Sequence, residues 1–339
     1  MGASAITPVT VLTGFLGSGK TTLVNRLVRD ARFADTAVLV NEWGVIPIDH
    51  ALVREASDNV VVLAGGCICC RVAGEVVSTL RELHFLRAEG RVPDFRRVVI
   101  ETTGLADPSP LLATLVEMPL VAARYSLAGV VATIDAEYGK RALAAHGESV
   151  KQVALADRIV VTKCDLVAPA SLAPLEARLA AINPGATILR SANADLDVAR
   201  LLDTGLYRGE GLAADTRGWL NAGAYRSMGT GARHDAGIDS FAWTTEEPRA
   251  WDDVESALAT LLRLRGNRIL RLKGLVNVRG ELGPRAVHAV QHRLYPSARL
   301  PAWPDADRST RLVFIGRGLE EGEIAGILES SPRSASVQR

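Results

Sequence analysis

The stretch GFLGSGKTT at residues 14–22 decides how the chain folds around it. It fits the pattern of a glycine, four free positions and then Gly-Lys-Ser/Thr, which cradles phosphate groups. An apolar run at residues 7–13 precedes it, and a helical pattern with Leu23, Leu27 and Val28 on one face follows it. A strand before the loop and a helix after it bring backbone N–H groups and a positive helix end to one point. A plain glycine-rich turn is the alternative, but these flanks favour a phosphate-binding loop.

The residue types within the loop suit this chemistry. Gly14, Gly17 and Gly19 let the backbone wrap closely around phosphate. Lys20 is placed to reach the β and γ phosphates of a nucleotide, and the Thr21 hydroxyl is placed to ligate Mg²⁺. The loop therefore predicts a bound nucleoside phosphate with Mg²⁺.

Length and composition narrow the class of protein. The 339 residues suffice for two domains, each with its own core, and the hydrophobic content is 48%. The net charge of +1 and the lack of a basic tract argue against a nucleic-acid partner. No apolar run reaches membrane-spanning length, and the N-terminus does not resemble a signal peptide, so we expect a cytoplasmic protein without membrane contact. The four cysteines do not form a disulfide framework, and three of them lie within four residues.

Apolar runs alternate with helical patterns through the first 204 residues. Runs that are apolar throughout are typical of strands buried on both faces. They occur at residues 7–13, 37–40, 60–63, 98–100, 130–134, 159–161 and 187–189, with helical patterns such as 72–89 and 172–181 between them. The sequence therefore predicts an α/β domain at 1–204, a P-loop NTPase with a mostly parallel sheet and helices on both faces.

The remainder of the chain has a different organisation. Residues 205–237 are dense in glycine and predict a linker, and residues 331–339 predict a frayed tail. Strands at 238–244, 269–278, 285–295 and 311–315 are bunched between helices at 248–264 and 319–328. We therefore expect a smaller C-terminal α+β domain with an antiparallel sheet at 238–330. His288 and His292 would then lie on the same side of one strand, and we expect a structural role for both.

Polar segments follow the predicted strands at their carboxyl ends, which meet at one edge of a parallel sheet. Glu101 follows one strand, where a nucleotide-binding fold needs a carboxylate for Mg²⁺, and the Gly104 N–H can meet a γ-phosphate. The alternative is that Glu101 is a charge near the start of the next helix. The further segments at this edge are NEWGVIPID at 41–49, GGCICC at 65–70, ETTGLADP at 101–108 and TKCD at 162–165.

The TKCD segment resembles the NKxD signature that reads guanine. The Asp165 carboxylate can accept from guanine N1–H and its exocyclic amine, while the Lys163 stem packs across the ring. Adenine lacks that donor pair. A solvated turn is the alternative, and Thr162 stands where the signature has Asn. Ser191 and Ala192 resemble a second loop on the guanine side.

Cys67, Cys69 and Cys70 form a CxCC run in a glycine-flanked loop. Thiolates at this spacing can converge on one cation such as Zn²⁺, Co²⁺ or Cu⁺, and Glu42 from a neighbouring loop can complete the shell. Buried inert cysteines and a redox pair are the alternatives. Cys164 is interpreted as a small packing residue.

These motifs, in this order, resemble the CobW family of P-loop GTPases over nearly the whole chain. The C-terminal stretches RLKGLVNVRG and STRLVFIGR resemble the second domain of that family. The resemblance implies a metallochaperone or metal-insertion GTPase. Carried over residue by residue, it implies phosphate contacts at Gly14, Gly17, Ser18, Gly19, Lys20, Thr21 and Thr22, Mg²⁺ at Thr21 and Glu101, guanine at Lys163 and Asp165, and the trafficked metal at Cys67, Cys69, Cys70 and Glu42.

We therefore expect a slowly hydrolysing GTPase that carries zinc or cobalt to a client metalloprotein under control of GTP. A homodimer is compatible with this expectation. A P-loop small-molecule kinase would need the loop and Glu101 but not the cysteines, and preference for ATP would favour it. A non-enzymatic metal buffer or regulatory module is the other alternative, in which nucleotide only sets the conformation.

Overall fold

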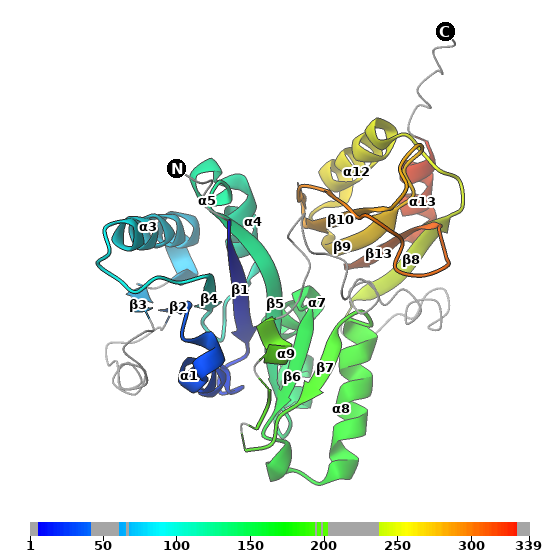
Figure 1. The fold of residues 1–339 in the computed structure, drawn as a ribbon. Coiled ribbons are helices and arrows are strands. Elements are labelled where there is room, and N and C mark those ends of the chain that lie inside the picture. Colours follow the sequence, from blue (N-terminus) through cyan, green and yellow to red (C-terminus); the bar gives the residue numbers. More distant parts are fainter. Residues whose placement is uncertain are drawn as a thin grey trace. The chain divides into compact units, whose positions relative to one another are not determined.

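The computed structural model describes residues 6–41, 61–65, 68–193, 195–197, 199–202 and 237–330. These residues fall into two compact units, of which the first contains a parallel sheet and the second an antiparallel sheet (Figure 1). Residues 205–236 of the predicted linker 205–237, and the predicted tail 331–339, lie outside the described residues. None of the described helices is both long and apolar enough to span a membrane.

All seven strands predicted for the first unit are confirmed. They are β1 (Thr7–Gly14), β2 (Thr36–Asn41), β3 (Val61–Gly65), β4 (Arg97–Glu101), β5 (Tyr125–Asp135), β6 (Arg158–Thr162) and β7 (Thr187–Arg190). They form one sheet in the order β3-β2-β4-β1-β5-β6-β7, and every neighbouring pair is parallel. The carboxyl ends of all seven strands therefore lie at one edge of the sheet.

Helices cover both faces of this sheet (Figure 1). They are α1 (Lys20–Arg29), α3 (Ile68–Ala88), α4 (Ser109–Glu117), α5 (Pro119–Ala122), α6 (Gly139–Ala145), α7 (Gly147–Leu155), α8 (Pro169–Ile182) and α9 (Ala199–Leu202), with short 3₁₀ turns at Ala31–Phe33 and Cys164–Leu166. The two helical patterns predicted at 72–89 and 172–181 correspond to α3 and α8.

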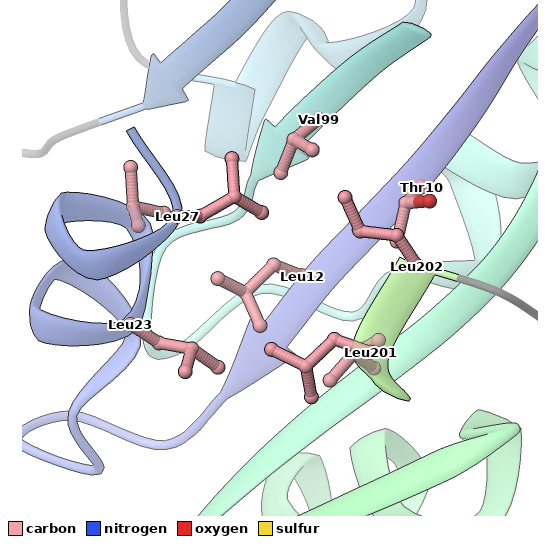
Figure 2. Close-up of a pocket in the computed structure, with 9 residues that line it drawn as sticks. Thr10, Leu12, Leu23, Leu27, Val99, Leu201 and Leu202 are labelled. Carbon is pink, nitrogen blue, oxygen red and sulfur yellow. The ribbon is translucent and has the colours of Figure 1, made fainter. Parts of the chain in front are cut away.

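The core beneath α1 forms because β1 alternates its apolar side chains between the two faces of the sheet. Leu12 from β1 meets Leu23 and Leu27 from α1, and Leu201 from α9 closes the cluster (Figure 2). A gap of about 10 Å³ remains there, and its lining is apolar apart from Thr10. A gap of this size is at the lower limit for one water molecule, so it is a packing defect and not a ligand site.

The second unit packs two helices on one face of its antiparallel sheet. Its elements are β8 (Asp239–Thr245), α12 (Trp251–Arg265), β9 (Ile269–Val276), β10 (Arg285–Val290), β11 (Arg293–Leu294), β12 (Ala298–Arg299), β13 (Thr310–Gly316) and α13 (Glu321–Glu329). The sheet order is β11-β10-β9-β13-β8, and β12 pairs with β10. Leu258 and Leu261 of α12 and Ile324 of α13 pack against Leu272 and Phe314 of the sheet.

One predicted strand of this unit is wrong. Residues 285–295 form two strands, β10 and β11, because the chain reverses at Gln291, whose φ is 49°. His288 remains in β10, where its ring stacks on Tyr295 with 4.7 Å between centroids. His292 lies in the turn, with Nδ1 2.9 Å from the Leu262 carbonyl oxygen, so the two histidines do not share one side of a strand.

Candidate nucleotide-binding site

The phosphate loop joins β1 to α1 without interruption, since β1 ends at Gly14 and α1 begins at Lys20. Gly14, Gly17 and Gly19 all have positive φ, at 141°, 69° and 90°. At Gly14 a Cβ would also lie 2.8 Å from the Ser18 hydroxyl oxygen. A Cβ there would also collide with Thr133 of β5, so a side chain at this position would push the start of the loop away from its neighbouring strand.

Hydroxyl groups tie the loop to its neighbouring strands. Ser18 Oγ lies 2.7 Å from Thr133 Oγ1 of β5, and Ser18 is 2% exposed. Thr162 of β6 donates its hydroxyl to the Ser18 carbonyl at 2.8 Å. Thr162 stands where the guanine signature usually has Asn, and its hydroxyl supplies a direct connection between that segment and the phosphate loop.

The Lys20 ammonium group is folded over its own loop. Its Nζ donates to the carbonyl oxygens of Gly14 at 2.9 Å and Phe15 at 3.2 Å. Burial lowers the pKa of Lys20, and the charge of Glu101 opposes that change. A phosphate group that replaced these carbonyl partners would find a buried cation already in place, so the residues present fit an anionic ligand.

Thr21 and Glu101 meet beside Lys20. The Thr21 hydroxyl donates to Glu101 Oε1 at 3.0 Å, and Glu101 is 3% exposed. This carboxylate belongs to the end of β4 and is not a cap of the following helix, since α4 begins at Ser109 with Pro108 at its N-cap. A hydroxyl and a carboxylate are the hard oxygen donors that suit Mg²⁺.

The loop after β4 packs directly on the phosphate loop. A Cβ at Gly104 would lie 2.6 Å from the backbone nitrogen of Leu16, so only glycine allows this approach. The fully buried Gln152 of α7 donates its amide to the carbonyls of Gly104 and Ala106, both at 3.1 Å. Lys151 adds an ion pair to Asp107 at 2.8 Å.

The N-terminal end of α7 also contacts the phosphate loop. The His146 ring, at the N-cap of α7, stacks on Phe15 with 4.4 Å between centroids and 24° between planes. Sequence reasoning missed Gln152, Lys151 and His146. The one available signal was Gln152 itself, a polar residue between the buried Val150 and Val153 of an amphipathic helix.

The predicted guanine-side residues lie together at the ends of β6 and β7. Lys163 has a left-handed backbone with φ 56°, and its Nζ lies 2.6 Å from Asp135 Oδ2 at the end of β5. Asp165 Oδ1 accepts from the Asn193 backbone N–H at 2.7 Å. Sequence reasoning missed Asp135, which fixes the direction of the Lys163 stem.

The two loops on this side are joined through backbone hydrogen bonds. The Ser191 carbonyl accepts from Cys164 N–H at 3.1 Å across the two loops, and within the second loop the Ala192 carbonyl accepts from Asp195 N–H at 2.6 Å. Burial raises the pKa of the Cys164 thiol, which lies 3.2 Å from the Val161 carbonyl oxygen, in agreement with a packing role.

The predicted metal ligands are only partly within the described residues. Glu42 and Cys67 lie outside them, whereas the backbones of Cys69 and Cys70 belong to the first turn of α3. Among the residues that the structure describes, no three His, Cys, Asp or Glu side chains form a metal-binding group. The metal site therefore stays a prediction.

The phosphate loop, the Thr21–Glu101 pair and their place at the carboxyl edge of a parallel sheet define the class: this is a P-loop nucleotide-binding protein. Residues 8–190 match the family described as CobW/HypB/UreG, nucleotide-binding domain. Residues 238–331 match the cobalamin synthesis protein cobW C-terminal domain. The chain therefore belongs to the CobW family, as the sequence motifs predicted.

Several characterised relatives match nearly the whole chain. The zinc chaperone YjiA of Escherichia coli is 32% identical over 93% of this chain and 96% of its own length. The zinc chaperone CobW of Pseudomonas aeruginosa is 30% identical over 96% of this chain and 91% of its own length. The crystal structure of Zn(II)-bound YjiA GTPase from E. coli is 26% identical and covers 96% of this chain and 99% of its own, with a TM-score of 0.71.

Proposed function

We propose that this protein is a slowly hydrolysing GTPase that carries a transition metal and releases it to a client metalloprotein. The metal is zinc or cobalt, and its ligands are Cys67, Cys69, Cys70 and Glu42. The names of the relatives, zinc chaperones from two bacteria, favour zinc. The observation that carries the nucleotide part is the hydrogen bond from Thr21 to Glu101 beside the phosphate loop. The loop after β4 also packs on the phosphate loop at position 104, where only glycine fits.

Each residue at the phosphate end has a distinct role in this proposal. Lys20 exchanges its loop carbonyls for β and γ phosphate oxygens, and Gly104 directs its N–H toward the γ-phosphate. Thr21 and Glu101 would hold Mg²⁺, which neutralises charge on the phosphates when bound. We expect slow turnover because the Gln152 NH2 group, near the loop after β4, is already bonded to the Gly104 and Ala106 carbonyls.

Specificity for guanine rests on Asp165 and Lys163 in this proposal. Asp135 holds Lys163 Nζ at 2.6 Å, so the lysine stem is oriented before a base arrives. Asp165→Ala should therefore lower GTP affinity at least tenfold and leave ATP affinity unchanged. Preference of the unsubstituted protein for ATP would instead support a phosphotransferase.

Strand register supports a coupling between nucleotide and metal. Val40 of β2 pairs with Glu101 of β4 on one side and with Ala64 of β3 on the other, and Asn41 pairs with Gly65. The chain segments that lead to Glu42 and to the cysteine run therefore leave the sheet at the level of Glu101. A change in phosphate state at this edge can alter metal affinity, and linkage requires metal to alter GTP affinity by the same factor.

Anaerobic competition for Zn²⁺ against a chromophoric chelator tests the proposal. We expect zinc affinity to change at least tenfold when a non-hydrolysable GTP analogue is present. Cys67→Ser should weaken zinc binding, whereas Cys164→Ser, the matched control outside the run, should not. Equal zinc affinities with and without nucleotide would refute the coupling, and unchanged binding by Cys67→Ser would refute the metal site.

A further inference from the structure

A second recess lies on the first unit, between α3 and α5. It has a volume of about 80 Å³ and is lined by Arg81, His84, Phe85, Leu120, Val121, Arg124 and Tyr125. It lies at the opposite edge of the sheet from the phosphate loop, since Tyr125 pairs with Thr7 and Thr133 pairs with Gly14. Seven residues of strand separate the two levels by roughly 20 Å, so this recess is not part of the nucleotide site.

The walls of the recess are apolar and its rim is exposed. Val121 and Tyr125 are nearly fully buried, and the Tyr125 hydroxyl donates to the Leu80 carbonyl at 2.9 Å. Phe85 and Leu120 are 55% and 52% exposed on either side. A cavity of 150 Å³ holds benzene, so a recess of about 80 Å³ suits an aliphatic side chain better than an aromatic one.

Two arginines give the rim its charge. Arg124 donates Nε to His84 Nε2 at 3.0 Å, which requires a neutral imidazole and fixes the guanidinium against α3. Arg81 is exposed one turn earlier on α3. Neither guanidinium has a carboxylate partner among the residues that the structure describes, whereas nearby Arg87 is paired with Asp94 at 2.7 Å.

Charge and shape together select the occupant. Guanidinium groups without a carboxylate partner favour carboxylates, and an exposed apolar rim around a recess favours a buried aliphatic anchor. We propose that this recess is a docking site for an acidic peptide segment of a protein partner. An aliphatic side chain of the segment enters between Phe85 and Leu120, and its neighbouring carboxylates pair with Arg81 and Arg124.

Helix α3 connects the recess to the cysteine run. The helix begins at Ile68, within the cysteine run, and extends past Phe85 to Ala88. The distance from Ile68 to Phe85 is roughly 25 Å along the helix axis. The docking proposal itself depends on neither nucleotide nor metal, so it is tested in the absence of both.

Fluorescence anisotropy with the full chain tests the docking site. The probe is a labelled peptide of sequence Glu-Asp-Leu-Glu-Asp, with one control peptide carrying Gly for Leu and another carrying Lys for every acid. We expect saturable binding that weakens at least tenfold for either control peptide. Absence of saturation below millimolar peptide, or equal binding of the Gly peptide, would overturn the proposal.

A matched pair of variants separates a site from general charge attraction. Arg81→Glu and Arg96→Glu change net charge equally, but Arg96 is 82% exposed and does not line the recess. We expect at least a tenfold loss for Arg81→Glu, less than twofold for Arg96→Glu, and a loss for Leu120→Ser with an unchanged unfolding transition. Equal losses from both arginine variants would overturn the site. Binding to anionic phosphatidylserine vesicles is measured with the same variants. If vesicle binding depends on Arg81 and peptide binding does not, the ligand is a membrane and the peptide proposal is overturned.

Discussion

The buried amide of Gln152 offers the sharpest test of how the first unit senses nucleotide. Gln152 of α7 is fully buried and donates to the carbonyls of Gly104 and Ala106 in the loop after β4. Gln152→Met keeps the side-chain length and removes both donors. At about 1 kcal/mol net for each hydrogen bond, we expect the free energy of unfolding to fall by about 2 kcal/mol.

Loss of these two hydrogen bonds should also reduce the preference of the protein for GTP over GDP. The loop holds Gly104, whose N–H we assign to the γ-phosphate, so freeing it weakens binding of a non-hydrolysable GTP analogue but not of GDP. The ratio of GTP-analogue affinity to GDP affinity should fall by at most about 30-fold, which corresponds to the full 2 kcal/mol. Displacement of a fluorescent guanine nucleotide, by the GTP analogue in one titration and by GDP in another, measures the two affinities.

The neighbouring residue supplies the control. Lys151→Met breaks the ion pair between Lys151 and Asp107, whose two side chains are 30% and 28% exposed respectively. We therefore expect the free energy of unfolding to fall by about 1 kcal/mol or less, with little change in nucleotide selectivity. A Gln152→Met protein that unfolds more easily but keeps its affinity ratio within twofold would show that Gln152 only supports the fold. The reasoning about the γ-phosphate loop would then be refuted.

Three further predictions concern the same edge of the sheet. Thr162→Val removes the hydroxyl that donates to the Ser18 carbonyl, and calorimetry of GTP binding should show an affinity lower by about 1–2 kcal/mol. Gly104→Ala should reduce GTP affinity at least tenfold because its Cβ meets the phosphate loop. Gly322→Ala, where a Cβ meets nothing within 4 Å, should leave binding unchanged and stabilise α13 by at most about 1 kcal/mol in thermal unfolding. Burial opposes ionisation of Asp107, but hydrogen bonds from Lys151 and Ser109 outweigh it and lower its pKa below 3.8. This carboxylate therefore stabilises the fold above pH 3.8 and loses that effect as pH falls through its folded pKa, and Asp107→Asn should flatten this part of an acid unfolding curve.

Much of the fold was predictable because its signals are local. Each buried parallel strand is a continuous apolar run, and the phosphate loop carries its own glycines and lysine. The reversal at Gln291 was missed because residues 285–295 keep strand-like composition through the turn, and the left-handed backbone occurs at a residue that is not glycine.

The candidate site was predictable where one residue type reports its chemistry, as for Lys20, Thr21 and Glu101. The contacts that support these residues could not be predicted from the sequence. Lys163 is 28 positions from Asp135, and Gln152 is 48 from Gly104, so nothing in the sequence near either residue indicates its partner. These pairs depend on how β5, β6 and α7 come together in the folded sheet.

The hydrogen bonds that hold the phosphate loop in shape also affect the rate at which nucleotide associates. Lys20 donates to two loop carbonyls, and Ser18 is bonded to β5 and β6, so the protein's own contacts set the shape of the loop. Association then resembles docking onto a rigid surface and does not wait for a segment to order. The slow step of an exchange cycle should accordingly be departure of the nucleotide, and a partner that accelerates the cycle would have to act by loosening these contacts.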